Sequence, residues 1–490
     1  MNIDKTILSK KGYLIPINDN NKKLINGIKK ELTVKPIIPF QYSIIKKQSP
    51  KIQVFQEYDN YLAVPKYYGL SKFGKPYKNK ETAGESINIE FKGSLRDMQK
   101  EIINNILPHI NNTGGGVLCL PCAAGKTVLS LYLISQFKVK TLVIVHKTFL
   151  LNQWKERAEQ FTNAKLGILQ RDKIDVEGKD IVIGMLQSIA KDKYNEDIFK
   201  DFGMVIFDEA HHAPSEYFSR ALPIIASKIT IGLSATPKRS DGLEQILYWY
   251  FGDIMYKMEN TKNNNVLVNI IKYDLEHEKF KEYLLKTGDV NRPKTINKIT
   301  TIGRRNKFII DYVQEVLEDE PNRKILILSD RIEHLKLLKN RLDLREITTS
   351  DFYIGGMKQE LLDKAEKAQV IFASYGMAAE ALDIPDLNTL FMVTSRKEVE
   401  QAVGRIVRKV DPNIRPTIYD FTDQLPCFVN QGYNRRRLYK KKGFEIKIID
   451  VLNNEIKKET DLSQINDISE ININKNNDNN DNNENIDFID

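Results

Sequence analysis

Short apolar runs recur along the chain between Leu95 and Asp253, and each run ends in polar or small residues. The runs read GVLCLP (116–121), TLVIVH (141–146), DIVIGM (180–185), MVIFDE (204–209) and ITIGLSAT (229–236), and stretches with a helical pattern separate them. Apolar runs of this length are typical of buried strands. Strands that alternate with helices form parallel sheets with helices on both faces. The pattern therefore predicts an α/β domain over residues 91–260.

The same alternation returns in the second half of the chain, after the polar stretch KNNNV (262–266). Its apolar runs are KILILSD (324–330), AQVIFAS (368–374) and LNTLFMVTS (387–395). We therefore expect a second α/β domain over residues 301–460, joined to the first by a linker over residues 261–300. Residues 1–90 contain strand-like and lysine-rich pieces without a clear period, and we treat them as an accessory region. Residues 461–490 are rich in Asn and Asp and predict a disordered tail.

Composition narrows the class of protein. The chain has 490 residues, 41% of them hydrophobic, but it contains no apolar run long enough to cross a bilayer, so we expect no membrane segment. It has three cysteines and no basic-then-apolar leader, which predicts an intracellular protein that is not secreted. The net charge is +9, and because the last thirty residues carry −7, the preceding chain carries +16. Such an excess favours a polyanionic partner such as nucleic acid, although solvated lysines would give the same count.

A candidate phosphate-binding loop follows the run GVLCL and precedes an apolar helix. Backbone N–H groups in such a loop cradle phosphates, Lys126 is placed to reach the β and γ oxygens, and the Thr127 hydroxyl is a candidate Mg²⁺ ligand. Leu120 stands where many such loops have a first glycine. An ordinary loop is one alternative. A metal pair of Cys119 and Cys122 is another, but no second Cys/His pair follows. The loop residues are Pro121, Cys122, Ala123, Ala124, Gly125, Lys126 and Thr127.

The run MVIFDEAHH delivers two acids to the end of a predicted strand. Ligands of open α/β sheets bind at the carboxyl ends of the strands. Asp208 is suited to hold Mg²⁺, and Glu209 is suited to orient an attacking water molecule. A solvated turn is the alternative. Together with the Gly-Lys-Thr loop, the pair predicts an ATPase.

The ordered set of motifs from Leu95 to Lys409 resembles superfamily 2 helicases and translocases of the DEAH-box type. Besides the loop and Asp-Glu-Ala-His (208–211), the set includes LRDMQ (95–99), VIVHKTFLLNQWKER (143–157), GLSATPKRSDG (232–242), ASYGMAAEALDIPDL (373–387) and QAVGRIVRK (401–409). Within that superfamily, the loop and GLSATPKRSDG look most similar to the xeroderma pigmentosum group B type and to helicases of large DNA viruses, including the poxvirus transcript-release type.

The resemblance implies two RecA-like lobes with ATP between them. It assigns adenine recognition to Gln99, transition-state stabilisation to Arg405 and Arg408 beside Gln401, and cleft positions to Glu380 and Asp383. It further implies that Ser234, Ala235 and Thr236 couple hydrolysis to movement. Contacts to a nucleic-acid backbone would come from Lys147, Thr148, Gln153, Gln187, Arg239 and Ser374. The run NRRRLYKKKGF (434–444) either extends that groove or is a solvated surface.

Two alanines depart from the family pattern, because Ala123 and Ala381 replace glycines that are common at their positions. If either backbone requires a positive φ, the alanine costs about 1 kcal/mol. We nevertheless expect an ATP- and Mg²⁺-dependent helicase or translocase, active as a monomer on DNA, in viral transcription, replication or repair. Such a protein would act in the host cytoplasm or the virion, with transcription or replication machinery as possible partners. An RNA helicase and a catalytically weak nucleic-acid clamp are the alternatives.

Overall fold

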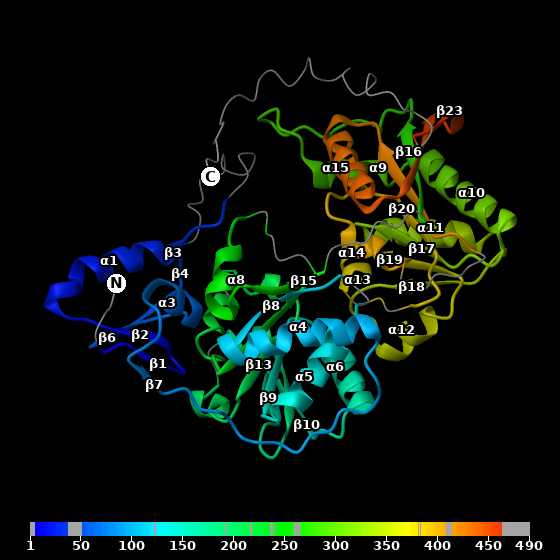
Figure 1. Cartoon of the computed structure of the whole chain (residues 1–490). Helices are drawn as coiled ribbons and strands as arrows, with labels where there is room; N and C mark the ends of the chain where they lie inside the picture. Colours follow the sequence, from blue (N-terminus) through cyan, green and yellow to red (C-terminus); the bar gives the residue numbers. More distant parts are fainter. Residues whose placement is uncertain are drawn as a thin grey trace. The chain divides into compact units, whose positions relative to one another are not determined.

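A computed structural model gives the structure of the protein, and it describes residues 5–37, 51–121, 124–191, 194–215, 218–235, 239, 241–258, 265–380, 382, 384–407 and 414–462. The chain forms two units, residues 1–260 and 261–490. Each contains an eight-stranded sheet in which neighbouring strands are parallel, except for the pair at one edge. Figure 1 labels many of the helices and strands of both units. The expected pair of tandem parallel-sheet α/β domains is therefore confirmed.

The first unit's large sheet has the strand order β11-β10-β12-β9-β13-β14-β8-β15. Its buried strands are runs of β-branched and aliphatic residues, which suits strands covered on both faces. All five apolar runs of the first α/β domain form strands of this sheet. The strands are β8 (Gly115–Cys119), β9 (Thr141–Val145), β10 (Leu166–Gln170), β11 (Lys173–Ile174), β12 (Ile181–Met185), β13 (Met204–Phe207), β14 (Ile229–Ser234) and β15 (Ile254–Lys257).

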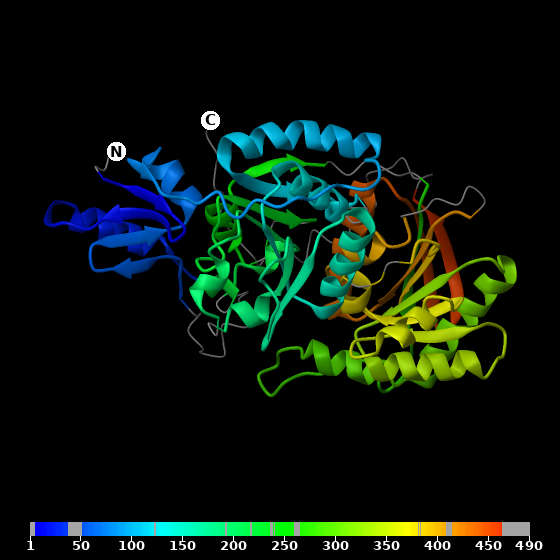
Figure 2. The same ribbon diagram turned by 90° about the horizontal axis from the view of Figure 1, so that it is seen from below.

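Alternate residues of these strands point into two separate cores, because side chains along a strand alternate between faces. Leu118, Val143 and Ile206 pack on one face with α4 (Asp97–Thr113), α5 (Lys126–Phe137) and α6 (Thr148–Phe161). Val117, Ile144 and Val205 pack on the other face with α7 (Leu186–Ile189) and α8 (Glu244–Phe251). The light-blue helix α4 lies beside β8 and β15, the last two strands at one edge of this sheet (Figure 2).

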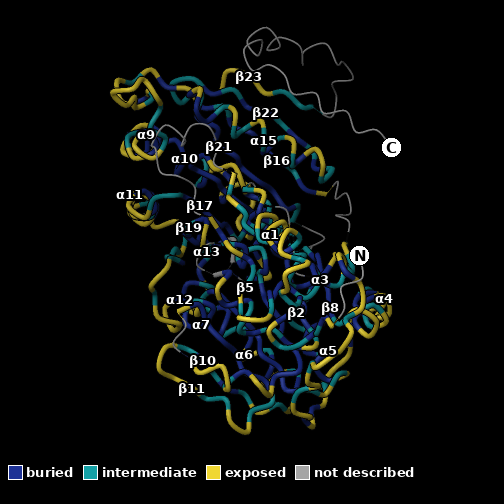
Figure 3. The backbone as a smooth tube through the Cα atoms, turned by 90° about the vertical axis from the view of Figure 1, so that its left-hand side faces the viewer, coloured by how far each residue is buried: buried dark blue, intermediate teal, exposed yellow. Residues whose placement is uncertain are grey.

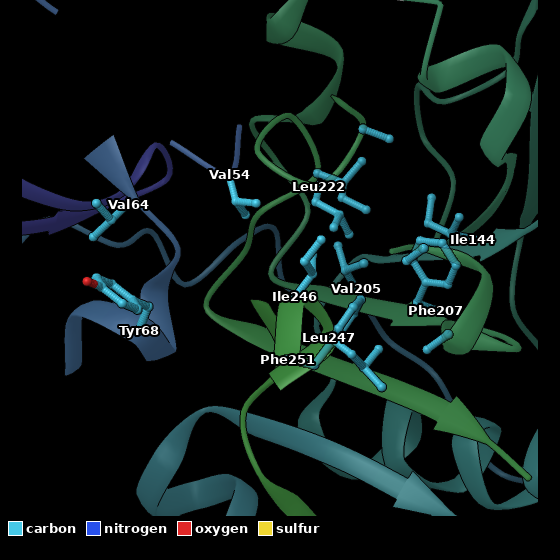
Figure 4. Close-up of a cluster of buried hydrophobic side chains, with 14 of the residues drawn as sticks. Val54, Val64, Tyr68, Ile144, Val205, Phe207, Leu222, Ile246, Leu247 and Phe251 are labelled. Atoms are coloured by element: carbon cyan, nitrogen blue, oxygen red, sulfur yellow. The ribbon is translucent and has the colours of Figure 1, made fainter. Parts of the chain in front are cut away.

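The accessory region forms its own five-stranded sheet, of order β5-β6-β2-β1-β7. Its elements are β1 (Ile7–Ser9), β2 (Gly12–Pro16), α1 (Lys22–Glu31), β5 (Gln56–Tyr58), β6 (Tyr61–Val64), α3 (Lys66–Phe73) and β7 (Lys78–Asn79), with a separate ribbon of β3 (Thr33–Val34) and β4 (Ile52–Gln53). Val54, Val64 and Tyr68 join the same buried cluster as Phe207 and Phe251 (Figure 4). The accessory region is therefore packed onto the first α/β domain through a continuous apolar core.

The second unit's sheet has the order β18-β19-β17-β20-β21-β16-β22-β23. The three predicted runs form strands β17, β19 and β20. The bounds are β16 (Leu267–Asp274), β17 (Ile325–Ser329), β18 (Ser350–Tyr353), β19 (Val370–Ser374), β20 (Thr389–Met392), β21 (Thr417–Asp423), β22 (Glu445–Leu452) and β23 (Glu455–Asp461). The central strands of both sheets are buried, whereas many connecting segments are exposed (Figure 3).

The expected linker over residues 261–300 requires a correction. Within it, β16 lies between β21 and β22 and pairs in parallel with both strands along its length. A strand in this position belongs to the sheet, so the second domain begins at or before Leu267. The sequence pattern did not predict β16, because the polar stretch KNNNV precedes it and a lysine interrupts LVNIIKYD. Polar residues weaken the apolar run by which a buried strand is identified.

Two helical layers cover the second sheet. Ile327, Phe372 and Phe421 pack with α9 (Arg292–Ile299), α10 (Gly303–Asp319) and α11 (Ile332–Asp343). Leu326, Ile371 and Ile418 pack with α12 (Gln359–Ala365), α13 (Tyr375–Glu380), α14 (Glu400–Val403) and the Tyr439 end of α15 (Pro426–Lys442). Across the described parts of the chain, no helix combines the length and apolarity needed to cross a membrane. The tail predicted over 461–490 lies outside the described residues from 463 onward.

Candidate functional site

The candidate phosphate loop connects β8 to α5. Gly125 is the N-cap residue of α5 at φ +84°, a left-handed conformation that glycine adopts without strain, and as a glycine it offers no capping side chain. The N-cap residue thus makes no side-chain bond to the first N–H groups of α5, and a helix N-terminus of this kind is suited to an anion. Lys126 and Thr127 are the first two residues of α5. Pro121 and Ala124 flank Cys122 and Ala123, which lie outside the described residues.

Gln99 and Arg96 brace this loop from the start of α4. The amide Nε2 of Gln99 donates to the carbonyl oxygen of Ala124 at 3.3 Å, and Arg96 Nη2 donates to the same oxygen at 3.0 Å. Gln99 Oε1 accepts from the Arg96 backbone N–H at 3.0 Å. A Cβ on Gly125 would lie 2.4 Å from Gln99 Nε2. The predicted adenine-binding Gln99 is therefore buried against the loop, next to the residue that needs to be glycine.

Asp208 and Glu209 directly follow β13, which lies beside β14 and β9. Glu209 has φ +49°, an uncommon conformation for a residue with a side chain and one that is frequent at functional sites. Its Oε1 lies 3.5 Å from Lys126 Nζ, and its Oε2 lies 3.3 Å from His211 Nδ1. The fold thus brings together the lysine of the loop and the acid of the DEAH sequence, as the sequence predicts for an ATPase.

Ser234 connects this acidic segment to the third predicted motif. It is the last residue of β14, and its hydroxyl lies 3.1 Å from His211 Nδ1 in the short helix η3 (Ala210–His212). Its carbonyl oxygen accepts from the Leu120 N–H at 3.0 Å, at the start of the phosphate loop. Ala235 follows directly, and Thr236 lies outside the described residues. Ser234 therefore contacts both the loop strand and the DEAH segment, which suits the coupling role predicted for it.

Burial and neighbouring charges set the protonation of this cluster. Burial, followed by the adjacent Glu209 charge, raises the pKa of Asp208. Burial also acts to raise the pKa of Glu209, but the Lys126 ammonium and the nearby histidines outweigh it, so this pKa is lowered. Burial lowers the pKa of His211 and favours the neutral ring. The carboxylates of Asp208 and Glu209 are adjacent and share one ammonium, that of Lys126. A divalent cation bound here would stabilise the charged form of both carboxylates.

The residues present therefore fit a bound nucleotide with Mg²⁺. Glu209 Oε2 is buried and accepts no hydrogen bond from the described residues, so it has an acceptor to offer. Thr127 and Asp208 supply the hydroxyl and carboxylate oxygens that Mg²⁺ prefers. Lys126 and the start of α5 supply the positive charge and the N–H donors that phosphates require.

Trp154 is a site residue that the sequence analysis did not single out. Its indole Nε1 donates to Asp208 Oδ2 at 2.8 Å, although the two residues are 54 positions apart. The signal in the sequence was a tryptophan on the apolar face of an amphipathic helix, whose N–H requires an acceptor once buried. Nothing in the sequence indicated that the acceptor would be Asp208.

Several predicted nucleic-acid contacts gather in the first unit around β9 and α6. Lys147 caps α6, Thr148 is its exposed first residue, and Gln153 is half-buried in its second turn. Gln187 donates to the carbonyl oxygen of His146. Arg239 pairs with Asp241 and donates to the carbonyl oxygen of His211, so its guanidinium also links its own segment to the DEAH segment.

The structure describes three of the predicted site residues in the second unit, Ser374, Gln401 and Arg405. Ser374 ends β19, and Gln401 lies half-buried in α14. Arg405 is buried, and its Nε donates to the carbonyl oxygen of Ala378 at 2.7 Å. Arg408 and Asp383 lie outside the described residues, as do Ala381 and the side chain of Glu380.

The run NRRRLYKKKGF is more than a charged surface, because one of its arginines is buried. Arg435 donates through Nη2 to Asp420 Oδ1 at 2.7 Å and through Nε to Asp420 Oδ2 at 2.8 Å. The Tyr439 hydroxyl donates to the same carboxylate at 2.9 Å. These contacts fix α15 against β21, so part of this charge run has a structural role.

The fold and this site together define a nucleoside-triphosphate-binding protein with two tandem parallel-sheet domains. A family model described as "Type III restriction enzyme, res subunit" matches residues 92–239. The chain is similar to the mimivirus protein L396, which carries the name of an ATP-dependent RNA helicase, with 36% identity over 90% of this chain and 86% of that protein. It is also similar to the DNA 3'-5' translocase XPB2 of Sulfurisphaera tokodaii, with 25% identity over 66% of this chain and 80% of XPB2. Among solved structures, the helicase domain of Pyrococcus furiosus Hef gives a TM-score of 0.46 at 14% identity, over 69% of this chain and 99% of that domain.

The chain belongs to the superfamily 2 helicases and translocases, near the xeroderma pigmentosum group B type and the helicases of large DNA viruses. The resemblance seen in the motifs is thus confirmed. The protein is an ATP-dependent enzyme of the helicase and translocase class, and its family binds nucleic acid.

Proposed function

We propose that this protein hydrolyses ATP with Mg²⁺ at the loop of residues 121–127 and uses the energy to translocate along DNA or to unwind it. The observation that carries the proposal is the position of Glu209. Its carboxylate lies at the end of β13, with Oε1 3.5 Å from Lys126 Nζ. Its Oε2 lies 3.3 Å from His211 Nδ1 but accepts no hydrogen bond from the described residues. A carboxylate in this place, with an oxygen that accepts no hydrogen bond from the described residues, can orient a water molecule toward a γ-phosphate.

The charged and polar residues at and around the loop have distinct roles in this proposal. The first N–H groups of α5 and Lys126 bind the phosphates, and Thr127 and Asp208 would hold Mg²⁺. Bound there, Mg²⁺ would neutralise charge on the phosphate oxygens. Glu209 orients the water and accepts its proton, while His211 and Ser234 relay the position of Glu209 to the segment that follows β14. Arg405 and Arg408, beside Gln401, are proposed to stabilise phosphoryl charge on the strength of the family resemblance.

DNA is the substrate that we propose, and RNA is the second candidate. XPB2 is named as a DNA translocase, and the motif resemblance includes the same type; the more similar mimivirus relative is named as an RNA helicase. Backbone contacts from Lys147, Thr148, Gln153, Gln187, Arg239 and Ser374 would serve a motor that ignores sequence, since phosphates carry no base information. A role in viral transcription, replication or repair is proposed on the same resemblance.

The test is Mg²⁺-dependent ATP hydrolysis by the wild type and by Glu209→Gln, without polymer and with single-stranded DNA, duplex DNA or single-stranded RNA. We expect turnover that DNA stimulates and that Glu209→Gln lowers by about 100-fold or more, with ATP binding retained. Stimulation by RNA alone would move the substrate to RNA. Tight nucleic-acid binding without turnover under any condition would replace the motor with a clamp.

A further inference from the structure

The indole of Trp154 is fully buried in the core between the sheet and α6, and its N–H points at the ATP site. Trp154 belongs to the same cluster as Leu150, Val143 and Ile206. Burying an indole N–H without an acceptor is costly, and here the acceptor is Asp208 Oδ2 at 2.8 Å. A charged acceptor makes this hydrogen bond one of the stronger kind.

Among the described residues, two donors fix the Asp208 carboxylate, one at each oxygen. The Glu209 backbone N–H donates to Oδ1 at 3.0 Å, and the Trp154 indole donates to Oδ2. The first donor belongs to the neighbouring residue and moves with the Asp208 backbone. Trp154 is therefore the donor that ties the carboxylate to a different element, the fourteen-residue helix α6.

The position of Trp154 on α6 adds a second relationship. Lys147 caps this helix, and Thr148 and Gln153 lie on it. Trp154 follows Gln153 directly. One rigid helix therefore carries proposed contacts to the nucleic acid and also the indole that donates to Asp208, the proposed Mg²⁺ ligand.

We propose that Trp154 is a positioning residue that holds Asp208 in the orientation required to bind Mg²⁺ with the nucleotide. The inference rests on the proposed function of the same site. Mg²⁺ requires near-ideal geometry from its ligands. Replacing a group that orients a metal ligand typically lowers the metal affinity by about 10-fold to 100-fold. The indole N–H contributes by fixing the carboxylate, without touching the substrate.

The variant Trp154→Phe removes the donor and keeps an aromatic ring in the core. The chain has two tryptophans, and the matched control is Trp249→Phe, because Trp249 lies on α8 with its ring edge-on to Tyr68 at 5.7 Å. A sharper variant is the Trp249→Phe protein produced with 3-benzothienylalanine in place of tryptophan. Position 154 is then the only one replaced, and sulfur takes the place of Nε1–H in a ring of nearly the same shape.

The measurement is the binding of a fluorescent mant-ADP to the full chain as Mg²⁺ is raised. We expect the Mg²⁺ concentration at half-saturation to rise about 10-fold in Trp154→Phe and in the benzothienyl protein. It should stay at the wild-type value in Trp249→Phe, and mant-ADP binding without Mg²⁺ should be equal in all four proteins. An unchanged Mg²⁺ requirement in the benzothienyl protein would overturn the proposal, even if Trp154→Phe fails to fold.

The Mg²⁺ titration and the turnover assay test separate properties of the protein. Mg²⁺-dependent mant-ADP binding requires no nucleic acid. If DNA and RNA leave ATP turnover unchanged, that result overturns the proposed motor, but the titration still tests the role of Trp154. A wild type that hydrolyses ATP with DNA and shows the same Mg²⁺ requirement as both Trp154 variants would overturn this inference and retain the proposed function.

Discussion

The Lys126 ammonium lies 3.5 Å from the Glu209 carboxylate, and both side chains are largely buried. They come from α5 and from the end of β13, 83 positions apart in the chain. Each charge of the pair compensates the other, and either would be costly to bury alone. A phosphate that binds Lys126 would compete for this ammonium, so the pair links nucleotide binding to the position of Glu209.

Replacing Lys126 by alanine should abolish this link. We expect Lys126→Ala to lower ATP turnover by roughly 100-fold or more, because the positive charge that stabilises the transferred phosphoryl group is lost. Steady-state hydrolysis with saturating DNA measures the effect. Lys126→Arg is the control that keeps the charge but changes the geometry. Activity in Lys126→Ala close to that of the wild type would contradict the assigned loop.

Gly125 should not tolerate a side chain. Gly125→Ala places a Cβ at φ +84° and 2.4 Å from Gln99 Nε2, so we expect a loss of about 1–3 kcal/mol in the free energy of unfolding, together with weaker mant-ATP binding. The matched control is Gly178→Ala. That glycine has φ +62° but no atom within 4 Å of the added Cβ, so only the backbone cost should appear there and nucleotide binding should be unchanged. Equal nucleotide affinity in the two variants would argue against the loop.

The buried pair of Arg435 and Asp420 should be essential for the second unit. Arg435→Met leaves the Asp420 carboxylate in the core without its cation, which costs about 3–5 kcal/mol. Urea denaturation of the full chain measures the change. Lys336→Met breaks an exposed pair with Glu333 and should change the stability by less than about 1 kcal/mol. A small effect of Arg435→Met would mean that α15 is held mainly by its apolar contacts.

The stability of the second unit should fall in mild acid because of His334. This ring is buried, with Nε2 3.0 Å from Asn306 Oδ1 and Nδ1 3.0 Å from Ser329 Oγ. Burial and the nearby Arg305 lower the pKa of His334 well below its usual value, whereas in the unfolded chain it titrates near about 6.5. The unfolded state therefore takes up the proton first, so the contribution of His334 to stability is constant above that pH and falls below it, by up to about 1.4 kcal/mol per pH unit.

Urea denaturation at pH 7.5 and pH 5.5 measures this dependence, with His334→Gln as the comparison. Glutamine keeps a donor and an acceptor but does not titrate. The wild type should be the more stable protein at pH 7.5, and the difference should narrow at pH 5.5. Parallel changes in the two proteins would assign the acid sensitivity to other groups.

Local sequence patterns were sufficient for much of the first unit. The five apolar runs of the first domain formed strands, and the loop and DEAH segments followed them as expected, because the signals were short, apolar and contiguous. The strand β16 was missed for the converse reason, since Asn269 and Lys272 interrupt its apolar pattern and a polar stretch precedes it. The accessory region also gave no clear signal, because its strands are two to five residues long.

The sequence by itself determined the class of this protein, since ordered motifs and strand-loop-helix patterns depend on residue types at short spacing. Only the tertiary structure decided which of these residues touch one another. Two of these contacts join segments that are distant in the chain: Trp154 with Asp208, and Gln99 with Arg96 on the Ala124 carbonyl. A third feature, the burial of Arg435 with Asp420, could not be recognised within a run of charged residues. The register of neighbouring strands and the packing of helices on each face of the sheet set these distances, and neither can be read from local spacing.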